Sequence, residues 1–223
     1  MSWSPWYPQN GGGGFVPNHA PPVHGFIPPH NQPYPQWGGQ AYTDAYGGQP
    51  PIAAQYSAKF PTLHPILAND TTKLRFDLKR NPQSEILAST YYSNRNLPAK
   101  ATPTNKFRII SKSFPWSIDI SPPGVNVTVG MVWDALYACL QEPIQDSEWG
   151  LIILDKKAKE RIEAAAKKRT EADPSSDKRI KRIDYLGDVT LFKGLEKDDD
   201  YAKTRLMPTT QAWHDTWLVK LTS

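Results

Sequence analysis

Apolar and polar side chains alternate along several stretches of the chain. Around Trp116, for example, Ile118 and Ile120 are separated from it and from each other by single polar residues. A period of two is typical of a strand with one buried face, because successive side chains of a strand point to opposite sides. The candidate strands are residues 73–79, 116–121 and 217–221, together with a shorter stretch at 107–110.

Two further segments have the spacing of a helix. Apolar residues fall on one face of residues 129–141, where Thr128 can cap the N-terminus and Pro143 ends the pattern. A second helix is predicted over residues 156–170, with Asp155 as its cap and only a thin apolar stripe. The order of strands, then helices, then short strands predicts an α+β fold, in which two or three helices pack on one face of a small antiparallel sheet.

The N-terminal quarter of the chain has a different composition. Residues 1–58 hold 11 of the 22 prolines, 9 of the 14 glycines and 10 aromatic residues, but no lysine, arginine or leucine. Such a segment buries too little apolar surface to offset the entropy of ordering its backbone. We therefore expect a disordered arm over residues 1–58 and a single α+β domain over 59–223. Aromatic side chains spaced among Pro, Gly and Gln favour weak self-association of the arm, although an inert tail is the simpler alternative.

The cellular setting follows from what the sequence contains. Cys139 is the single cysteine, so no disulfide forms within the chain, as is usual in a reducing compartment. The N-terminus lacks the basic and apolar regions of a signal peptide, and the longest aliphatic run, Leu151–Leu154, is too short to span a membrane. We expect an intracellular protein, cytoplasmic or nuclear, that is neither secreted nor membrane-spanning.

Several short motifs follow one another in a recognisable order. They are His64–Leu67, Leu74–Leu78, Pro98–Ala99, Ala101–Pro103, the strand around Trp116, Val127–Val129, Arg182–Leu186 and Phe192–Leu195. In this order they resemble an uncharacterised domain family of mushroom-forming, basidiomycete fungi, the domain of unknown function 6699, over about residues 60–221. The resemblance implies a fungal source and one compact domain, and it implies no activity or catalytic residues.

Catalytic and metal-binding signatures are missing from the sequence. It contains no nucleophile elbow, phosphate-binding loop, dinucleotide-binding fingerprint or zinc-protease motif. Cys139 is expected to be a buried structural thiol, His64 to pack in a turn before Pro65, and His214 and Asp215 to point to opposite faces of a strand. The acidic run of residues 198–200 is expected to be a solvated loop. We therefore expect no enzyme activity, cofactor or metal.

Positive charge is concentrated in one segment. Residues 155–182 hold eleven basic and six acidic side chains, an excess of five positive charges. Two basic clusters, residues 167–169 and 178–182, loosely resemble a bipartite nuclear import signal or a phosphate-contacting surface. A solvated helix face with i,i+4 ion pairs is the simpler interpretation. We expect that replacing the residues 178, 179, 181 and 182 leaves folding intact. The candidate binding residues are Lys167, Lys168, Arg169, Lys178, Arg179, Lys181 and Arg182.

Three functional hypotheses follow from these features. The first is a non-enzymatic protein-interaction module, whose domain binds one protein partner while the arm adds weak multivalent contacts. The second is a nucleic-acid-associated protein that binds phosphates through residues 155–182, and the third is an enzyme without a recognisable motif. An exposed apolar groove or strand edge would favour the first, a flat basic face the second, and a deep pocket with convergent polar groups the third.

Overall fold

The computed structural model describes residues 56–205 and 213–223. The predicted disordered arm lies almost wholly in residues 1–55, outside the described residues, and it stays a prediction. Ser57 is already buried, and its hydroxyl donates a hydrogen bond to Asp70 over 2.9 Å. The folded part therefore includes Ser57, one residue before the last position assigned to the arm.

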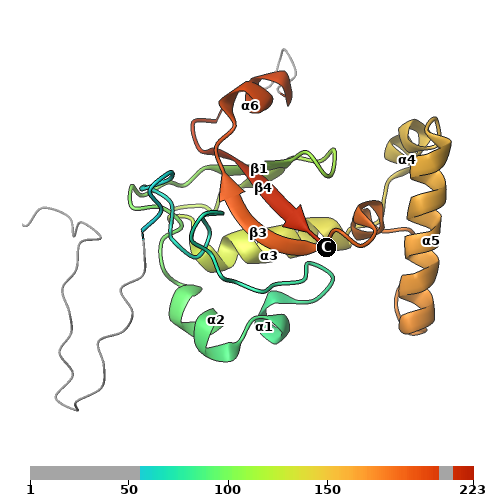
Figure 1. The fold of residues 1–223 in the computed structure, drawn as a ribbon, viewed down its shortest axis with the longest axis horizontal. Helices are drawn as coiled ribbons and strands as arrows, with labels where there is room; N and C mark the ends of the chain where they lie inside the picture. Colours follow the sequence, from blue (N-terminus) through green and yellow to red (C-terminus); the bar gives the residue numbers. More distant parts are fainter. Residues whose placement is uncertain (1–55, 206–212) are drawn as a thin grey trace, which may run out of the picture. The chain divides into compact units, whose positions relative to one another are not determined.

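A four-stranded sheet forms the centre of the described domain (Figure 1). Its strand order is β2-β1-β4-β3, with antiparallel pairing at both outer pairs and parallel pairing of β1 with β4. The sheet is therefore mixed, which the long connection between β1 and β4 allows. The strands are β1 (Phe107–Ser111), β2 (Ile118–Ile120), β3 (Leu191–Glu196) and β4 (Thr216–Thr222).

Three of the four strands coincide with predicted ones, and one does not. Residues 73–79 do not form a strand, because only Asp77 makes a β-bridge, to Leu191. Phe76 and Leu78 are nevertheless fully buried, as their alternation predicts. The fourth strand is β3, which pairs with β4 and contains a bulge at Gly194.

The two predicted helices are present with their predicted caps. Thr128 accepts a hydrogen bond from the N–H of Met131 at the start of α3 (Val129–Gln141). Asp155 accepts from two backbone N–H groups at the start of α5 (Lys156–Ala172). The shorter helices were not predicted: they are α1 (Pro82–Glu85), α2 (Ala88–Asn94), α4 (Asp146–Ile152), α6 (Asp199–Arg205) and the 3₁₀-helix η1 (Arg182–Leu186).

The core lies between one face of the sheet and helix α3. Trp133 of α3 is fully buried and stacks on Tyr91, with ring centroids 5.9 Å apart. Trp217 of β4 stacks on Phe107 of β1 at 6.1 Å. Together these elements confirm an α+β fold with a small sheet.

Helices α4 and α5 lie at one end of the domain, away from β1 and β4 (Figure 1). Helix α5 packs against η1 and buries Ala158, Ile162 and Ala166, the thin stripe that its sequence predicts. Its remaining surface is charged, with i,i+4 pairs such as Lys159–Glu163 at 3.7 Å. Among the described residues, no helix is both long enough and apolar enough to cross a membrane.

Candidate functional site

Arg169, one of the predicted binding residues, is a structural residue. Its guanidinium forms two hydrogen bonds of 2.9 Å with the carboxylate of Asp184, which is almost fully buried. It also donates to the backbone carbonyls of Asp177 and Arg179, over 2.7 and 2.8 Å. These four contacts fasten the end of α5 to the following loop and to η1, so this side chain is not available to an external phosphate.

Arg182, the last of the predicted binding residues, is also held inside the domain. Its guanidinium bonds to the carboxylates of Glu142 and Glu148 and lies over the ring of Trp116, 5.1 Å from the centroid. Trp116 itself donates its indole N–H to Glu148 over 2.8 Å. Burial opposes ionisation of Glu148, but the hydrogen bonds from Arg182, from the Gln145 backbone and from Trp116 outweigh it and lower the pKa of this carboxyl group.

This arrangement corrects one expectation from the sequence. Replacing residues 178, 179, 181 and 182 together was expected to leave folding intact, but the Arg182 side chain is only 14% exposed and links α3 to α4. A bipartite nuclear import signal in this segment would also need the side chains of Arg169 and Arg182, which both form ion pairs within the domain.

The other predicted cations lie at the surface, and most have acidic neighbours. Lys167 pairs with Glu171 at 3.8 Å, and Lys168 pairs with Asp188 at 3.1 Å. Arg179 pairs with Asp177 at 2.7 Å, and hydrogen bonds from the Arg179 side chain and backbone lower the pKa of Asp177 to about 2. Lys181 reaches the Gln141 side chain at 3.5 Å, while Lys178 has no ion pair among the residues described.

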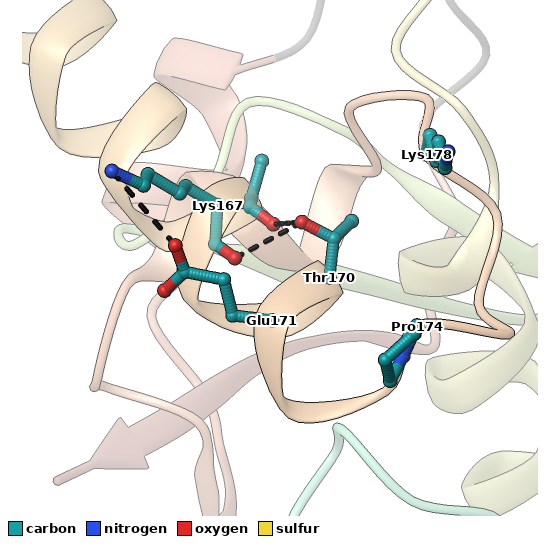
Figure 2. A pocket seen from close by; sticks show the side chains of 6 residues that line it. Lys167, Thr170, Glu171, Pro174 and Lys178 are labelled. Carbon is teal, nitrogen blue, oxygen red and sulfur yellow. Dashed lines mark hydrogen bonds and ion pairs between the residues drawn. The ribbon is translucent and has the colours of Figure 1, made fainter.

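A shallow hollow of about 430 Å³ lies beside these cations. Lys167, Thr170, Glu171, Pro174 and Lys178 surround it (Figure 2). The Thr170 hydroxyl lies 3.0 Å from the carbonyl oxygens of both Ala166 and Lys167, so its hydrogen is already used within the helix. With Lys167 paired to Glu171, the hollow offers a phosphate only one unpaired cation, Lys178, from its lining.

A second polar cluster joins Lys100, which the sequence does not single out, to the adjacent residues His214 and Asp215. Lys100 and Asp215 form a buried ion pair, although they are far apart along the chain. Burial opposes ionisation of Asp215, but several contacts lower the pKa of this carboxyl group, and the largest of them is its hydrogen bond with Lys100.

His214 is 95% exposed and its Nδ1 lies 3.5 Å from Asp215, so the two side chains do approach each other, contrary to expectation. They lie in the turn before β4 and not on the strand. Lys100 therefore supplies the countercharge of Asp215 and connects residue 100 to the turn before β4.

The remaining polar candidates have local structural roles. His64 is buried and accepts a hydrogen bond from the Ile66 N–H over 3.3 Å, and burial lowers its pKa to about 4. Cys139 is half-buried, and burial raises the pKa of its thiol. The acidic run of residues 198–200 is not a loop, because Asp199 and Asp200 form the first turn of α6 and Asp198 accepts a hydrogen bond from the Tyr201 N–H. No group of three potential metal ligands occurs within residues 56–205 and 213–223.

Exposed apolar side chains gather where α4 ends. Leu151, Ile153 and Leu154 are 73%, 45% and 82% exposed, and we name these three residues the apolar tip. Ile152 between them is buried and anchors the turn. In the sequence this run indicates only that it is too short for a membrane helix, because an aliphatic run by itself does not show whether it is buried.

The apolar tip is carried by a firmly held helix. Glu148 closes the N-terminus of α4 by accepting a hydrogen bond from the Gln145 N–H over 2.9 Å. The same carboxylate is bound by Arg182 and Trp116. Leu151 lies in the last turn of this helix, and Ile153 and Leu154 follow it in the turn that leads to α5. Because α4 is bound to the rest of the domain, ordering Leu151 against a partner costs little entropy.

The chain belongs to the family of unknown function DUF6699, which matches residues 74–201. This range lies within residues 60–221, the extent of the expected resemblance. Neither the curated proteins nor the solved structures contain a match to this chain. The family is one of unknown function and assigns no activity to the chain.

Proposed function

We propose that this protein is a non-enzymatic protein-interaction module, and the apolar tip is the observation that carries the proposal. Leu151 and Leu154 are more exposed than any other large apolar side chain of the described residues except Leu87. Leaving such side chains in water is unfavourable, and an exposed apolar patch on a rigid element is typical of a docking surface. Full burial of each leucine against a partner contributes about 1.5–3 kcal/mol.

The setting of the module belongs to the same proposal. We place it inside the cell, in the cytoplasm or nucleus, on the basis of the single cysteine. Residues 1–58 would add weak multivalent contacts through their aromatic side chains. We infer a source among mushroom-forming fungi from the sequence resemblance alone.

A nucleic-acid-binding role has less support than a protein-binding role. Of the seven cations proposed to bind phosphate, Arg169 and Arg182 are bound within the domain, and Lys167, Lys168 and Arg179 have acidic neighbours. An enzyme also has less support, since the hollow in Figure 2 is shallow and its hydroxyl group is already hydrogen-bonded.

The apolar tip can be tested by substitution in the full-length chain. We expect L151S/L154S to weaken binding of the partner about a hundredfold, because two buried leucines are lost from the interface. The measurement is quantitative affinity capture, combined with a photo-cross-linking amino acid at position 154, in cells that express the protein.

The matched control is Val125→Ser, which removes an apolar side chain that is 51% exposed outside the tip. A cross-linker at position 125 controls for unspecific capture. If the same proteins are captured at the same level by wild type and L151S/L154S, and position 154 gives no more cross-links than position 125, the apolar tip is not a docking surface.

A further inference from the structure

A second hollow, distinct from the apolar tip and from the basic segment, lies where residues 66–75 meet the region of α1 and α2. Its volume is about 430 Å³, the same as that of the hollow in Figure 2. Ile66, Leu74 and Leu87 give it apolar walls, and Lys73 and Arg75 also line it. We name this hollow the 66–90 groove.

The charge of the 66–90 groove is positive. Lys73 and Arg75 are exposed, and neither has an ion pair among the described residues. Glu85 is the acid of the lining, and it lies 3.8 Å from Arg80, which offsets its charge. Lys73 and Arg75 are therefore the charges that the groove offers to a ligand.

The groove is apolar as well as positive. Leu87 is 73% exposed, although it stands at the start of a helix whose next large residue, Tyr91, is buried in the core. The Thr90 side chain adds a hydroxyl group to the wall. A ligand that fills this site needs an apolar group to cover Leu87 and negative charge to meet the two cations.

We propose that the 66–90 groove binds an acidic peptide segment of a partner protein, with one apolar side chain anchored against Leu87, Leu74 and Ile66. Its carboxylates pair with Lys73 and Arg75. Aliphatic walls fit a peptide side chain better than a nucleic-acid base, which stacks on aromatic rings.

The test uses a random nonapeptide display library selected on the immobilised full-length protein. We expect the enriched peptides to combine a large apolar residue with acidic residues next to it. Their affinity is then measured by fluorescence anisotropy. We expect K73Q/R75Q to weaken binding about tenfold and to remove most of its salt dependence, because the two ion pairs are lost. Leu87→Ser should also weaken binding about tenfold.

Two variants control for charge and for the other surface. K167Q/K178Q removes the same charge from the hollow of Figure 2 and should leave peptide affinity unchanged. L151S/L154S should also leave it unchanged, so failure at the apolar tip and failure at the groove are separate results. Melting curves check that each variant is folded, and K73Q/R75Q alters only exposed side chains.

Three results would overturn the proposal. The first is a selection that enriches no peptides, or enriches peptides without the acidic and apolar combination. The second is unchanged affinity in folded K73Q/R75Q. The third is displacement of the selected peptide by a single-stranded oligonucleotide at equal concentration, which would assign the groove to nucleic acid.

Discussion

Gly194 shows how a single residue determines the edge of the sheet. Its φ is +105°, a backbone conformation that side chains disfavour, and a Cβ there would lie 2.5 Å from the Cα of Asn69. Leu195, next to it, accepts a backbone hydrogen bond from Asn69 and donates one to Leu67. The glycine therefore allows residues 67–69 to lie against β3.

We expect Gly194→Ala to destabilise the domain by about 3 kcal/mol, because backbone strain and a steric clash act together. Gly124→Ala is the matched control, since Gly124 also has a positive φ, +71°, but open space around it. Strain alone should make this control cost about 1 kcal/mol. Urea unfolding of both variants measures the difference, and equal losses would mean that the clash is relieved by a shift of residues 67–69.

His64 makes the free energy of unfolding depend on pH. Its pKa is lowered to about 4 by burial, from 6.5 in the unfolded chain. Between these values the unfolded state binds more protons than the folded state. The contribution of His64 to the free energy of unfolding is therefore fully present above about pH 6.5 and is lost as the pH decreases toward 4. The loss amounts to about 3 kcal/mol at most.

His64→Gln should flatten this dependence, because the amide oxygen can still accept from the Ile66 N–H but does not titrate. Unfolding curves at several pH values between 4 and 7 measure the effect. If the free energy of unfolding of the variant falls with pH as steeply as that of wild type in this range, other groups cause the pH dependence.

At the level of elements, Arg182 joins helices α3 and α4. We expect Arg182→Ser to destabilise the domain by about 2–3 kcal/mol, because it leaves the half-buried carboxylate of Glu148 without its cation. Arg179→Ser, at a side chain that is 71% exposed, should change stability by less than about 0.5 kcal/mol. Thermal melts of the two variants compare them, and similar melting temperatures would refute the structural role of Arg182.

The sequence predicted those elements whose signals are local. Helix α3 has both a cap and a complete apolar face, and its bounds were predicted correctly. Residues 73–79 were predicted as a strand because alternation reports burial on one side, whereas a strand also needs a hydrogen-bonded neighbour along its length. Strand β3 was missed because Lys193 and Gly194 interrupt its apolar pattern at the bulge.

The candidate site was less predictable than the fold. A run of basic residues looks the same whether its members are solvated or bound, and only the fold reveals that Arg169 meets Asp184. The apolar tip and the 66–90 groove depend on which leucines remain exposed, and exposure results from packing between distant segments. Neither surface leaves a motif in the sequence.

For the whole molecule, we expect only weak binding to nucleic acid. The surface cations are mixed with acids, so full-length protein should bind DNA and RNA no better than about 0.1 mM at physiological salt. Gel-shift titrations at two salt concentrations measure this binding to nucleic acid. The comparison is the variant K167Q/K168Q/K178Q/R179Q, which leaves Arg169 and Arg182 in place. A salt-sensitive shift that this variant abolishes would rank nucleic-acid binding above protein binding.

The parallel pairing of β1 with β4 has a consequence for how the chain folds during its synthesis. β4 is the last of the four strands to leave the ribosome, yet it occupies an inner position between β1 and β3. Arg108 pairs with Thr216, so the closing contact spans most of the domain sequence, and contacts of such separation slow folding. A nascent or truncated chain that stops before residue 216 lacks the strand that pairs with both β1 and β3, and unpaired strand edges promote aggregation.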